Sequence, residues 1–228
     1  MVWLWILLGI LLIFLALGLA GFEAACVRRE LPPQALTEEY LRGTSRAKWA
    51  EDFVFSSDWF YAQKPQTLRV MSYDGKMLSA RFLPREDAKG TILLFHGYRS
   101  SGLLDFGPEL EFLHRQGYNL LLCDQRAHGA SQGRYMTFGV RERYDVLSWV
   151  TYLAQMLGAE HPMFLSGMSM GATTVLLASC FTFPANVRGV IADCGFSSPS
   201  AILKCVLNER CKWLLAGLVL HPSDLFTR

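Results

Sequence analysis

Residues 163–179 read MFLSGMSMGATTVLLAS and carry the strongest structural signal in the chain. An apolar run enters this stretch, the pattern G-x-S-x-G follows at 167–171, and a helix-forming run of small residues leaves it. A nucleophilic serine on a sharp strand-to-helix turn needs this arrangement, because the strained backbone leaves no room for side chains at either glycine. The stretch therefore predicts a nucleophile elbow, with Ser169 as nucleophile and Gly167 and Gly171 as structural glycines. A glycine-flanked serine in an ordinary turn is the competing interpretation, and the strand and helix on either side favour the elbow.

Strand-like and helix-like segments alternate on both sides of this motif. Two β-prone runs flank Asp74-Gly75, a dipeptide that tight hairpin turns prefer. The later strand candidates are apolar on both faces, as strands covered by helices on two sides are. This alternation predicts an α/β fold: a mostly parallel sheet with helices on both faces and an antiparallel hairpin at its start. The expected strands are 67–72, 77–83, 91–95, 118–123, 162–167 and 187–193, and the expected helices are 110–115, 138–157, 170–180 and one that starts at Ser198-Pro199.

The tripeptide His96-Gly97-Tyr98 follows the third predicted strand at its carboxyl end, the edge where open α/β sheets build their sites. A loop at this point supplies one backbone N–H to an oxyanion hole, and the residue after the nucleophile supplies another. We therefore expect the N–H groups of Tyr98 and Met170 to face the oxyanion, where such donors are worth about 3–4 kcal/mol each. Gly97 belongs to the loop structure. His96 is expected to be a structural histidine and not a base.

A polar segment, DQRAHGASQG at 124–133, follows the fourth predicted strand. Its side chains are expected to tie down their own backbone. A metal site made of His96, His128 and Asp124 is the alternative interpretation. No pair among these three has the short ligand spacing of a helical or hairpin metal site, so a structural loop is favoured and no metal or organic cofactor is implied.

The segments HGYRSSG, DQRAHGASQG, GMSMGATT and IADCGFSSP, in this order and spacing, resemble the α/β-hydrolase superfamily. Within it, the chain is similar to the bacterial membrane-anchored or cytosolic esterases and serine-aminopeptidase-like hydrolases. The resemblance covers about residues 67–197. One departure is Ala127, where DxRGHG is the commoner form, and we expect this change to affect loop rigidity more than chemistry.

The resemblance implies a triad in the order serine, acid, histidine, with the last two after the seventh and eighth strands. About six of the eight strands are present, and helical sequence, like the beginning of a lid or connecting helix, follows from about residue 198. Downstream of Ser169, His221 is the only histidine, and Asp193 and Asp224 are the only aspartates. No predicted strand and loop deliver His221 to the site. We therefore expect the acid and the base to be missing, the hydrolase to be truncated at its C-terminus, and the chain as written to be inactive or weak.

Two further features agree with a missing C-terminal part. The apolar run WLLAGLVL at 213–220 has little sequence after it to cover it, and the strand at 187–193 is expected at a bare sheet edge. Two classes of function follow. One is an anchored serine hydrolase that transfers an acyl group from an ester, thioester or amide to water through an acyl-enzyme on Ser169. The other is a non-catalytic, membrane-associated binding protein, or an inactive fragment, that keeps the hydrolase scaffold.

Residues 1–22 contain no charged side chain and, as a helix, are long enough to span a bilayer. A cleaved signal peptide is the alternative, but it has a basic start and a shorter apolar core. Arg28 and Arg29 follow the run, so the positive-inside rule places the rest of the chain in the cytoplasm. We expect a single-pass anchor in the cell membrane at 1–22, a linker or arm at 23–66, and a partial hydrolase domain at 67–228.

Composition narrows the range of partners. The 228 residues are 51% hydrophobic, which excludes a disordered chain, and a net charge of +2 lacks the strong basic excess of a nucleic-acid binder. The six cysteines lack the spacing of a disulfide framework or zinc site and mostly lie in apolar runs, so buried free thiols in a reducing compartment are expected. The expected partners are the membrane, through the N-terminal helix, and a small-molecule, lipid or peptide acyl substrate.

Overall fold

The computed structural model describes residues 1–210, with side chains up to residue 204. The chain forms two compact units. The larger unit comprises residues 28–195 and holds Ser169 and the loops around it. The smaller unit comprises, among the described residues, 1–27 and 196–210.

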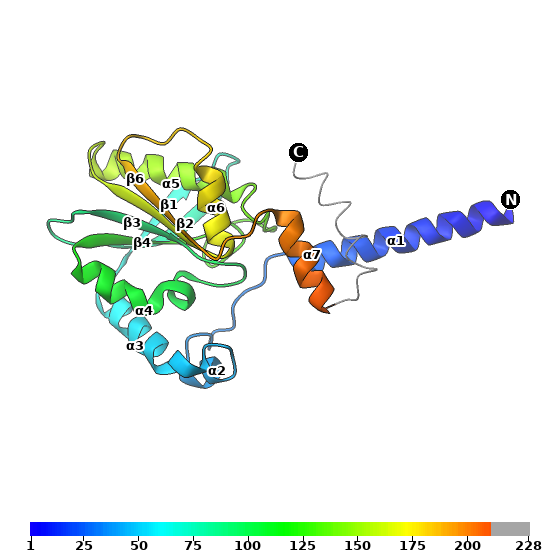
Figure 1. Ribbon diagram of the computed structural model, residues 1–228, viewed down its shortest axis with the longest axis horizontal. Helices are drawn as coiled ribbons and strands as arrows, with labels where there is room; N and C mark the ends of the chain where they lie inside the picture. The colour runs from blue at the N-terminus through cyan, green and yellow to red at the C-terminus, as the bar shows by residue number, and fades with distance from the viewer. Residues whose placement is uncertain (211–228) are drawn as a thin grey trace. The chain divides into compact units, whose positions relative to one another are not determined.

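The larger unit is built on six strands: β1 (Gln66–Met71), β2 (Met77–Leu83), β3 (Gly90–Phe95), β4 (Tyr118–Asp124), β5 (Met163–Met168) and β6 (Val187–Asp193). They form one sheet in the order β1-β2-β4-β3-β5-β6 (Figure 1). β1 and β2 form an antiparallel hairpin, β2 runs antiparallel to β4, and β4, β3, β5 and β6 are parallel. The predicted mostly parallel sheet with an initial hairpin is confirmed. Within residues 1–210, β6 is an edge strand as expected, and its Ile191 is 58% exposed.

Helices cover both faces of this sheet. α3 (Ala50–Ala62) and α4 (Gly102–Arg115) lie on one face, and α5 (Glu142–Leu157) and α6 (Met170–Ala178) lie on the other (Figure 1). The predicted helical cover on two sides is therefore also confirmed.

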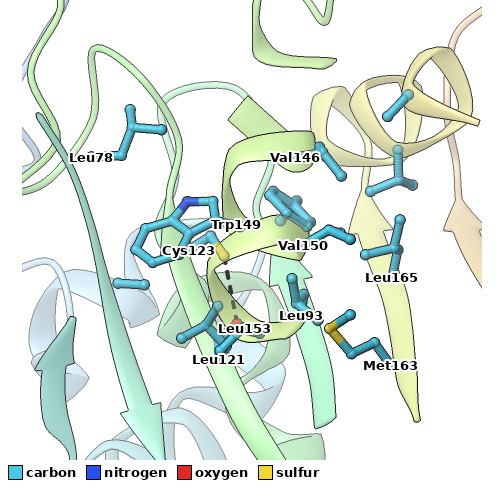
Figure 2. Packing of buried hydrophobic residues seen from close by; sticks show 14 of the residues in the cluster. Leu78, Leu93, Leu121, Cys123, Val146, Trp149, Val150, Leu153, Met163 and Leu165 are labelled. Carbon is cyan, nitrogen blue, oxygen red and sulfur yellow. Dashed lines mark hydrogen bonds between the residues drawn. The ribbon is translucent and has the colours of Figure 1, made fainter. Parts of the chain in front are cut away.

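Side chains of the central strands alternate between two buried cores. In β3, Leu93 joins the core beneath α5 and α6, whereas Leu94 joins the core beneath α3 and α4. Figure 2 shows the first core, where Trp149 and Leu153 of α5 lie beside Cys123 of β4. This two-residue period explains why the strands are apolar along their whole length, since each face buries its own set. Each fully buried aliphatic or aromatic side chain contributes about 1.5–3 kcal/mol.

The predicted strand boundaries agree with the observed ones to within one residue. α6 ends at Ala178, two residues before the predicted end, and two other helices differ at their starts. α4 begins at Gly102 and not at 110, because the Ser101 hydroxyl accepts the Leu104 N–H at 3.3 Å and starts the helix before Pro108. α5 begins at Glu142 and not at 138, because the Glu142 carboxylate binds the N–H groups of the preceding residues and holds them in a turn.

Residues 28–66 form a largely helical arm within the larger unit. α2 (Glu38–Arg42) and a short 3-10 helix (Ala47–Trp49) precede α3. α3 packs along α4, and its Phe60 is fully buried in the core beneath α4. The arm therefore packs, through α3, against α4 and the sheet beneath it.

The smaller unit contains α1 (Val2–Cys26) and α7 (Pro199–Arg210). α1 is long and apolar enough to cross a membrane, with a mean hydropathy of 2.8, and it continues past Phe22 to Cys26. A signal sequence meets the same test. α7 begins where the sequence predicted, with the Ser198 hydroxyl accepting the Ala201 N–H at 3.1 Å. The run 213–220, His221 and Asp224 lie outside the described residues.

The prediction that the cysteines are buried is wrong for two of them. Cys26 and Cys123 are buried, but Cys180 and Cys194 are exposed, and all four are free thiols. Cys180 follows α6 and Cys194 follows β6, so both stand where an apolar element has ended and the chain has reached the surface.

Candidate active site

Ser169 occupies the tight turn between β5 and α6. Its φ of +53° and ψ of −110° lie in a region that residues with a side chain rarely adopt. Two backbone hydrogen bonds hold this conformation: the Ser169 N–H donates to the Asp193 carbonyl at 2.9 Å, and the Thr173 N–H donates to the Ser169 carbonyl at 3.1 Å. The turn sits at the carboxyl edge of the parallel strands, where ligands of open α/β sheets bind.

The two glycines of the turn have no space for a side chain. A Cβ on Gly171 would lie 1.8 Å from the carbonyl oxygen of Phe95, and a Cβ on Gly167 would lie 2.2 Å from the carbonyl oxygen of Gly171. Both obstacles are backbone atoms, which cannot move aside without displacing β3 or α6. The close approach therefore joins the turn to the end of β3.

The loop that follows β3 lies against the turn. A Cβ built on Gly97 would stand 3.3 Å from the Cβ of Ser169, so the predicted oxyanion loop and the predicted nucleophile are neighbours. Met170 is fully buried and is the first residue of α6, so its N–H belongs to the helical turn that has no acceptor within the helix. The structure thus brings Ser169, Met170 and Gly97 together, with Tyr98 next in the chain.

The side chain of Tyr98 is half-buried. Its ring stacks on Phe138 with centroids 5.3 Å apart and an interplanar angle of 22°. The guanidinium of Arg99 lies 4.8 Å from the Tyr98 ring centroid. These contacts fix the side chain at the residue whose N–H was predicted to bind the oxyanion.

His96 is fully buried, and both of its ring nitrogens are occupied by backbone groups. Nε2 accepts the Gln125 N–H at 3.1 Å, so Nδ1 carries the proton and donates to the Gly97 carbonyl at 2.8 Å. Burial lowers the pKa of His96, which keeps the ring neutral. Gln125 also donates its side-chain amide to the His96 carbonyl and accepts from Thr174 of α6 at 3.0 Å. A neutral ring bonded on both sides links β3 to the next loop and has no nitrogen left for a substrate.

His128 repeats this arrangement one loop further along. Its Nε2 accepts the Arg99 N–H at 3.0 Å, and its Nδ1 donates to the Arg126 carbonyl at 3.0 Å. Burial lowers the pKa of His128 to about 3. Because the nitrogens of His96 and His128 are all hydrogen-bonded to backbone, neither offers a lone pair to a metal ion. No group of three metal-ligating side chains is present among the residues that the structure describes.

The prediction that side chains of the segment 124–133 hold their own backbone is met by Asp124 and His128 but is wrong for Arg126, which binds side chains of other elements. The Asp124 carboxylate accepts the Ala130 N–H at 2.9 Å, and burial raises the pKa of Asp124. Arg126 is 2% exposed and forms two hydrogen bonds with Asp145 of α5, at 2.6 and 2.7 Å. Its third nitrogen bonds Asp74 of the β1–β2 hairpin at 3.0 Å. The segment therefore ties the hairpin, the sheet and α5 together.

The other two histidines that the structure describes lie at the amino ends of the parallel strands, on the opposite side of the sheet from Ser169. His161 precedes β5, where its Nε2 meets the Thr91 hydroxyl at 2.9 Å. His114 is in the last turn of α4, and its Nε2 meets the Pro84 carbonyl at 3.2 Å. Within residues 1–210, then, no histidine is placed as a base for Ser169.

One buried carboxylate next to the site was missed by sequence reasoning. Asp105, in the first turn of α4, accepts the Gly97 N–H at 2.6 Å. Its ion-pair partner is Arg46 of the arm, at 3.0 Å. No local motif signals this pair, because the two residues are 59 positions apart.

Comparison with known proteins agrees with this geometry. Residues 86–219 match the serine aminopeptidase S33 family, and this span is more than half of the chain. Over 114 residues, 49% of this chain and 36% of the relative, the chain is 31% identical to the uncharacterized protein YqkD of Bacillus subtilis. Over 134 residues, 57% of this chain and 39% of the relative, it is 28% identical to the caffeoylshikimate esterase of Arabidopsis thaliana. The chain thus spans well under two thirds of the length of either relative.

A solved structure shares the same fold. An esterase of Pyrococcus furiosus superposes with a TM-score of 0.57 and 25% sequence identity, over 73% of this chain and 64% of that one. With the family match, the sheet order and the turn at Ser169, this likeness places the fold. The chain belongs to the serine aminopeptidase S33 family of the α/β-hydrolase superfamily.

Proposed function

We propose that this protein is a serine hydrolase that transfers an acyl group from a carboxylic ester, thioester or amide to water. The observation that carries the proposal is the backbone at Ser169, whose positive φ stands between two glycines pressed against neighbouring backbone. Holding a residue other than glycine in this conformation costs about 1–3 kcal/mol of folding free energy, and residues strained in this way occur most often at active sites.

In the proposed reaction, the Ser169 hydroxyl attacks the carbonyl carbon and passes its proton to a general base. The N–H groups of Tyr98 and Met170 hold the negative oxygen of the tetrahedral intermediate. Its collapse expels the alcohol, thiol or amine, which takes the proton from the base, and leaves the acyl group on Ser169. Water, deprotonated by the same base, then releases the carboxylic acid and restores the serine. No metal or organic cofactor takes part in this scheme.

We place the base of this scheme outside residues 1–210, since the histidines in that part of the chain are occupied elsewhere. A serine without a base remains a protonated alcohol and a weak nucleophile. Residues 1–210 by themselves would then supply only the effect of an oxyanion hole and substrate binding, about 10³–10⁴ over water. The same observation favours a second candidate, a membrane-associated binding protein that keeps the hydrolase scaffold.

The substrate class we favour is a carboxylic ester of a small molecule or lipid. Two similar proteins, from Arabidopsis thaliana and Pyrococcus furiosus, are named esterases. The family name supports peptide amides as the other class. Because the pocket that selects an acyl group is built by loops that differ among hydrolases, the scaffold itself does not choose between them.

We further propose that α1 is retained as a single-pass membrane anchor and that the hydrolase unit lies in the cytoplasm. The support is the absence of charge in residues 1–22, the helical length of Val2–Cys26 and the arginines that follow. Carbonate-resistant fractionation with the membranes tests the anchor. A mature protein whose N-terminus begins after residue 20 would make α1 a cleaved signal sequence.

A fluorophosphonate probe, applied to a chain extended to include the acid and the base and followed by mass-spectrometric location of the adduct, tests the proposed function. We expect the adduct on Ser169, no labelling of Ser169→Ala, and unchanged labelling of the control Ser179→Ala. Ser179 suits the control because it is exposed, at the C-terminal end of α6. An adduct on another residue would refute the assignment of the nucleophile. A chain that is folded but never labelled would support the binding protein instead.

A further inference from the structure

The Asp105 carboxylate fastens both ends of the loop that carries Tyr98. One oxygen, Oδ2, accepts the Gly97 N–H at 2.6 Å, and the other, Oδ1, accepts the Ser100 hydroxyl at 2.6 Å. This loop, residues 96–101, leaves β3 and enters α4. The Asp105 side chain therefore holds the loop both near its start, at Gly97, and near its end, at Ser100.

Asp105 is itself held in place. It lies in the first turn of α4, and its side chain is only 5% exposed. The Arg46 guanidinium stands 3.0 Å from Oδ1, donates from Nε to the Leu104 carbonyl at 3.1 Å, and lies 5.9 Å from the ring centroid of Phe53. Arg46 therefore supplies the positive charge that a buried carboxylate needs, from a helical arm that precedes the sheet in the sequence.

The loop that Asp105 fastens touches the proposed nucleophile. A Cβ built on Gly97 would stand 3.2 Å from Asp105 Oδ2 on one side and 3.3 Å from the Ser169 Cβ on the other. The carboxylate and the serine thus enclose Gly97 between them. Asp105 holds the His96–Gly97 peptide through its N–H, and the His96 ring holds the Gly97–Tyr98 peptide through the Gly97 carbonyl, so the two bonds together direct the Tyr98 N–H.

We propose that Asp105 and Arg46 are positioning residues that hold the oxyanion loop at the distance from Ser169 that catalysis needs. This inference rests on the proposed hydrolase function. Both oxygens of Asp105 are taken by donors of the protein, so Asp105 acts through the loop and not on the substrate. The arm then contributes to the site without contacting the reacting atoms.

The test compares the full chain with Asp105→Ala, Asp105→Asn and Arg46→Met in detergent micelles. The control is Arg42→Met, which removes an exposed arginine of the same arm that pairs with Glu38. Hydrolysis of a short-chain nitrophenyl ester gives kcat and KM, with the rate of Ser169→Ala subtracted. Hydrogen exchange by mass spectrometry reports the loop peptide 96–101 separately from the rest of the chain.

A misdirected oxyanion donor weakens binding of the transition state but not of the ester. We therefore expect Asp105→Ala to lower kcat by about 10²-fold, the loss typical of a missing oxyanion donor, with little change in KM. Arg46→Met should lower kcat by less, and Asp105→Asn should recover part of the loss because its amide oxygen still accepts the Gly97 N–H. In both Asp105→Ala and Arg46→Met, exchange should quicken in 96–101 and not elsewhere, and Arg42→Met should match the parent.

The outcomes separate this inference from the proposed function. A parent chain without any Ser169-dependent hydrolysis is the result expected of a missing base, and hydrogen exchange of 96–101 then decides. Exchange that Asp105→Ala and Arg46→Met leave unchanged refutes the positioning role, whereas a probe adduct on a residue other than Ser169 refutes the proposed function. A Ser169-dependent rate that Asp105→Ala and Arg46→Met leave unchanged refutes only the positioning role, as does a loss that appears in KM alone. If Asp105→Ala fails to fold, Arg46→Met decides, because its side chain is 35% exposed and its removal leaves Asp105 in place.

Discussion

Acid is expected to destabilise this fold through two buried histidines. His96 and His128 each accept a backbone N–H on Nε2, and a proton at that nitrogen would break the bond and place a charge in the interior. Burial accordingly lowers the pKa of both, that of His128 from 6.5 to about 3. Between these two values the unfolded chain binds a proton at His128 that the folded chain does not. The stability that the neutral ring contributes is therefore complete above pH 6.5 and is lost as the pH falls toward 3.

The size of the effect follows from the shift. One pKa unit corresponds to about 1.4 kcal/mol, so His128 alone should lower the free energy of unfolding by about 2 kcal/mol between pH 7.5 and pH 5. His96 adds a loss of the same sign. Asp124 opposes both, because burial raises the pKa of its carboxyl and favours the folded state as the pH falls. A comparison of variants is therefore needed to isolate His128.

Urea unfolding in detergent, followed by far-ultraviolet circular dichroism from pH 5 to pH 8, measures this loss. His128→Gln is expected to be less stable than the parent at pH 7.5, since it loses the bond to Arg99, but its stability should fall by about 2 kcal/mol less on going to pH 5. The control Ser179→Ala, an exposed position without a titratable group, should keep the parent's pH dependence. If His128→Gln shows the same pH dependence as the parent, the buried neutral imidazole is not the cause.

Three further perturbations probe the scaffold and the chemistry. Gly171→Ala should prevent folding of the elbow, because its Cβ would lie 1.8 Å from the Phe95 carbonyl oxygen; circular dichroism and the loss of probe labelling report it. Arg126→Met should lower the free energy of unfolding by about 3–5 kcal/mol, the usual cost of leaving a buried carboxylate such as Asp145 unpaired, and urea unfolding at neutral pH measures it. Residues 1–228 assayed alone on a nitrophenyl ester should turn over well below about 1 s⁻¹, at a rate that His221→Ala does not change. Faster turnover that vanishes in His221→Ala would make that histidine the base.

Local sequence predicts the sheet well because each strand can be recognised from the pattern of its own side chains. The run TILLF at 91–95 is apolar at every position, and both of its faces are buried. The helix α4 was predicted only from 110 onward, since Gly102, Gly107 and Pro108 are poor helix formers when read alone. Its early start depends on the Ser101 cap and on packing against the sheet, which override local propensity.

The candidate site likewise has one part that local sequence predicts and another part that only the folded chain brings together. The turn at Ser169 was predictable because its glycines and its serine stand within five consecutive positions. The Arg46–Asp105 pair was not, because it joins residues that only the folded arm brings together. Ala127 is an intermediate case: its φ of +60° lies in the left-handed region that glycine prefers, which gives a physical reason for the commoner DxRGHG form.

The arm supports the loops around Ser169 from a second direction. The Arg28 guanidinium donates to the carbonyls of Gly129 and Ser131, and Gly129 directly follows His128 in the chain. Since His128 in turn accepts the Arg99 N–H, a chain of hydrogen bonds connects Arg28 to the oxyanion loop. The sequence interpretation counted Arg28 only as a charge that orients the N-terminal helix. In the folded chain the same guanidinium is committed to backbone carbonyls, so it also supports the loop that follows β4.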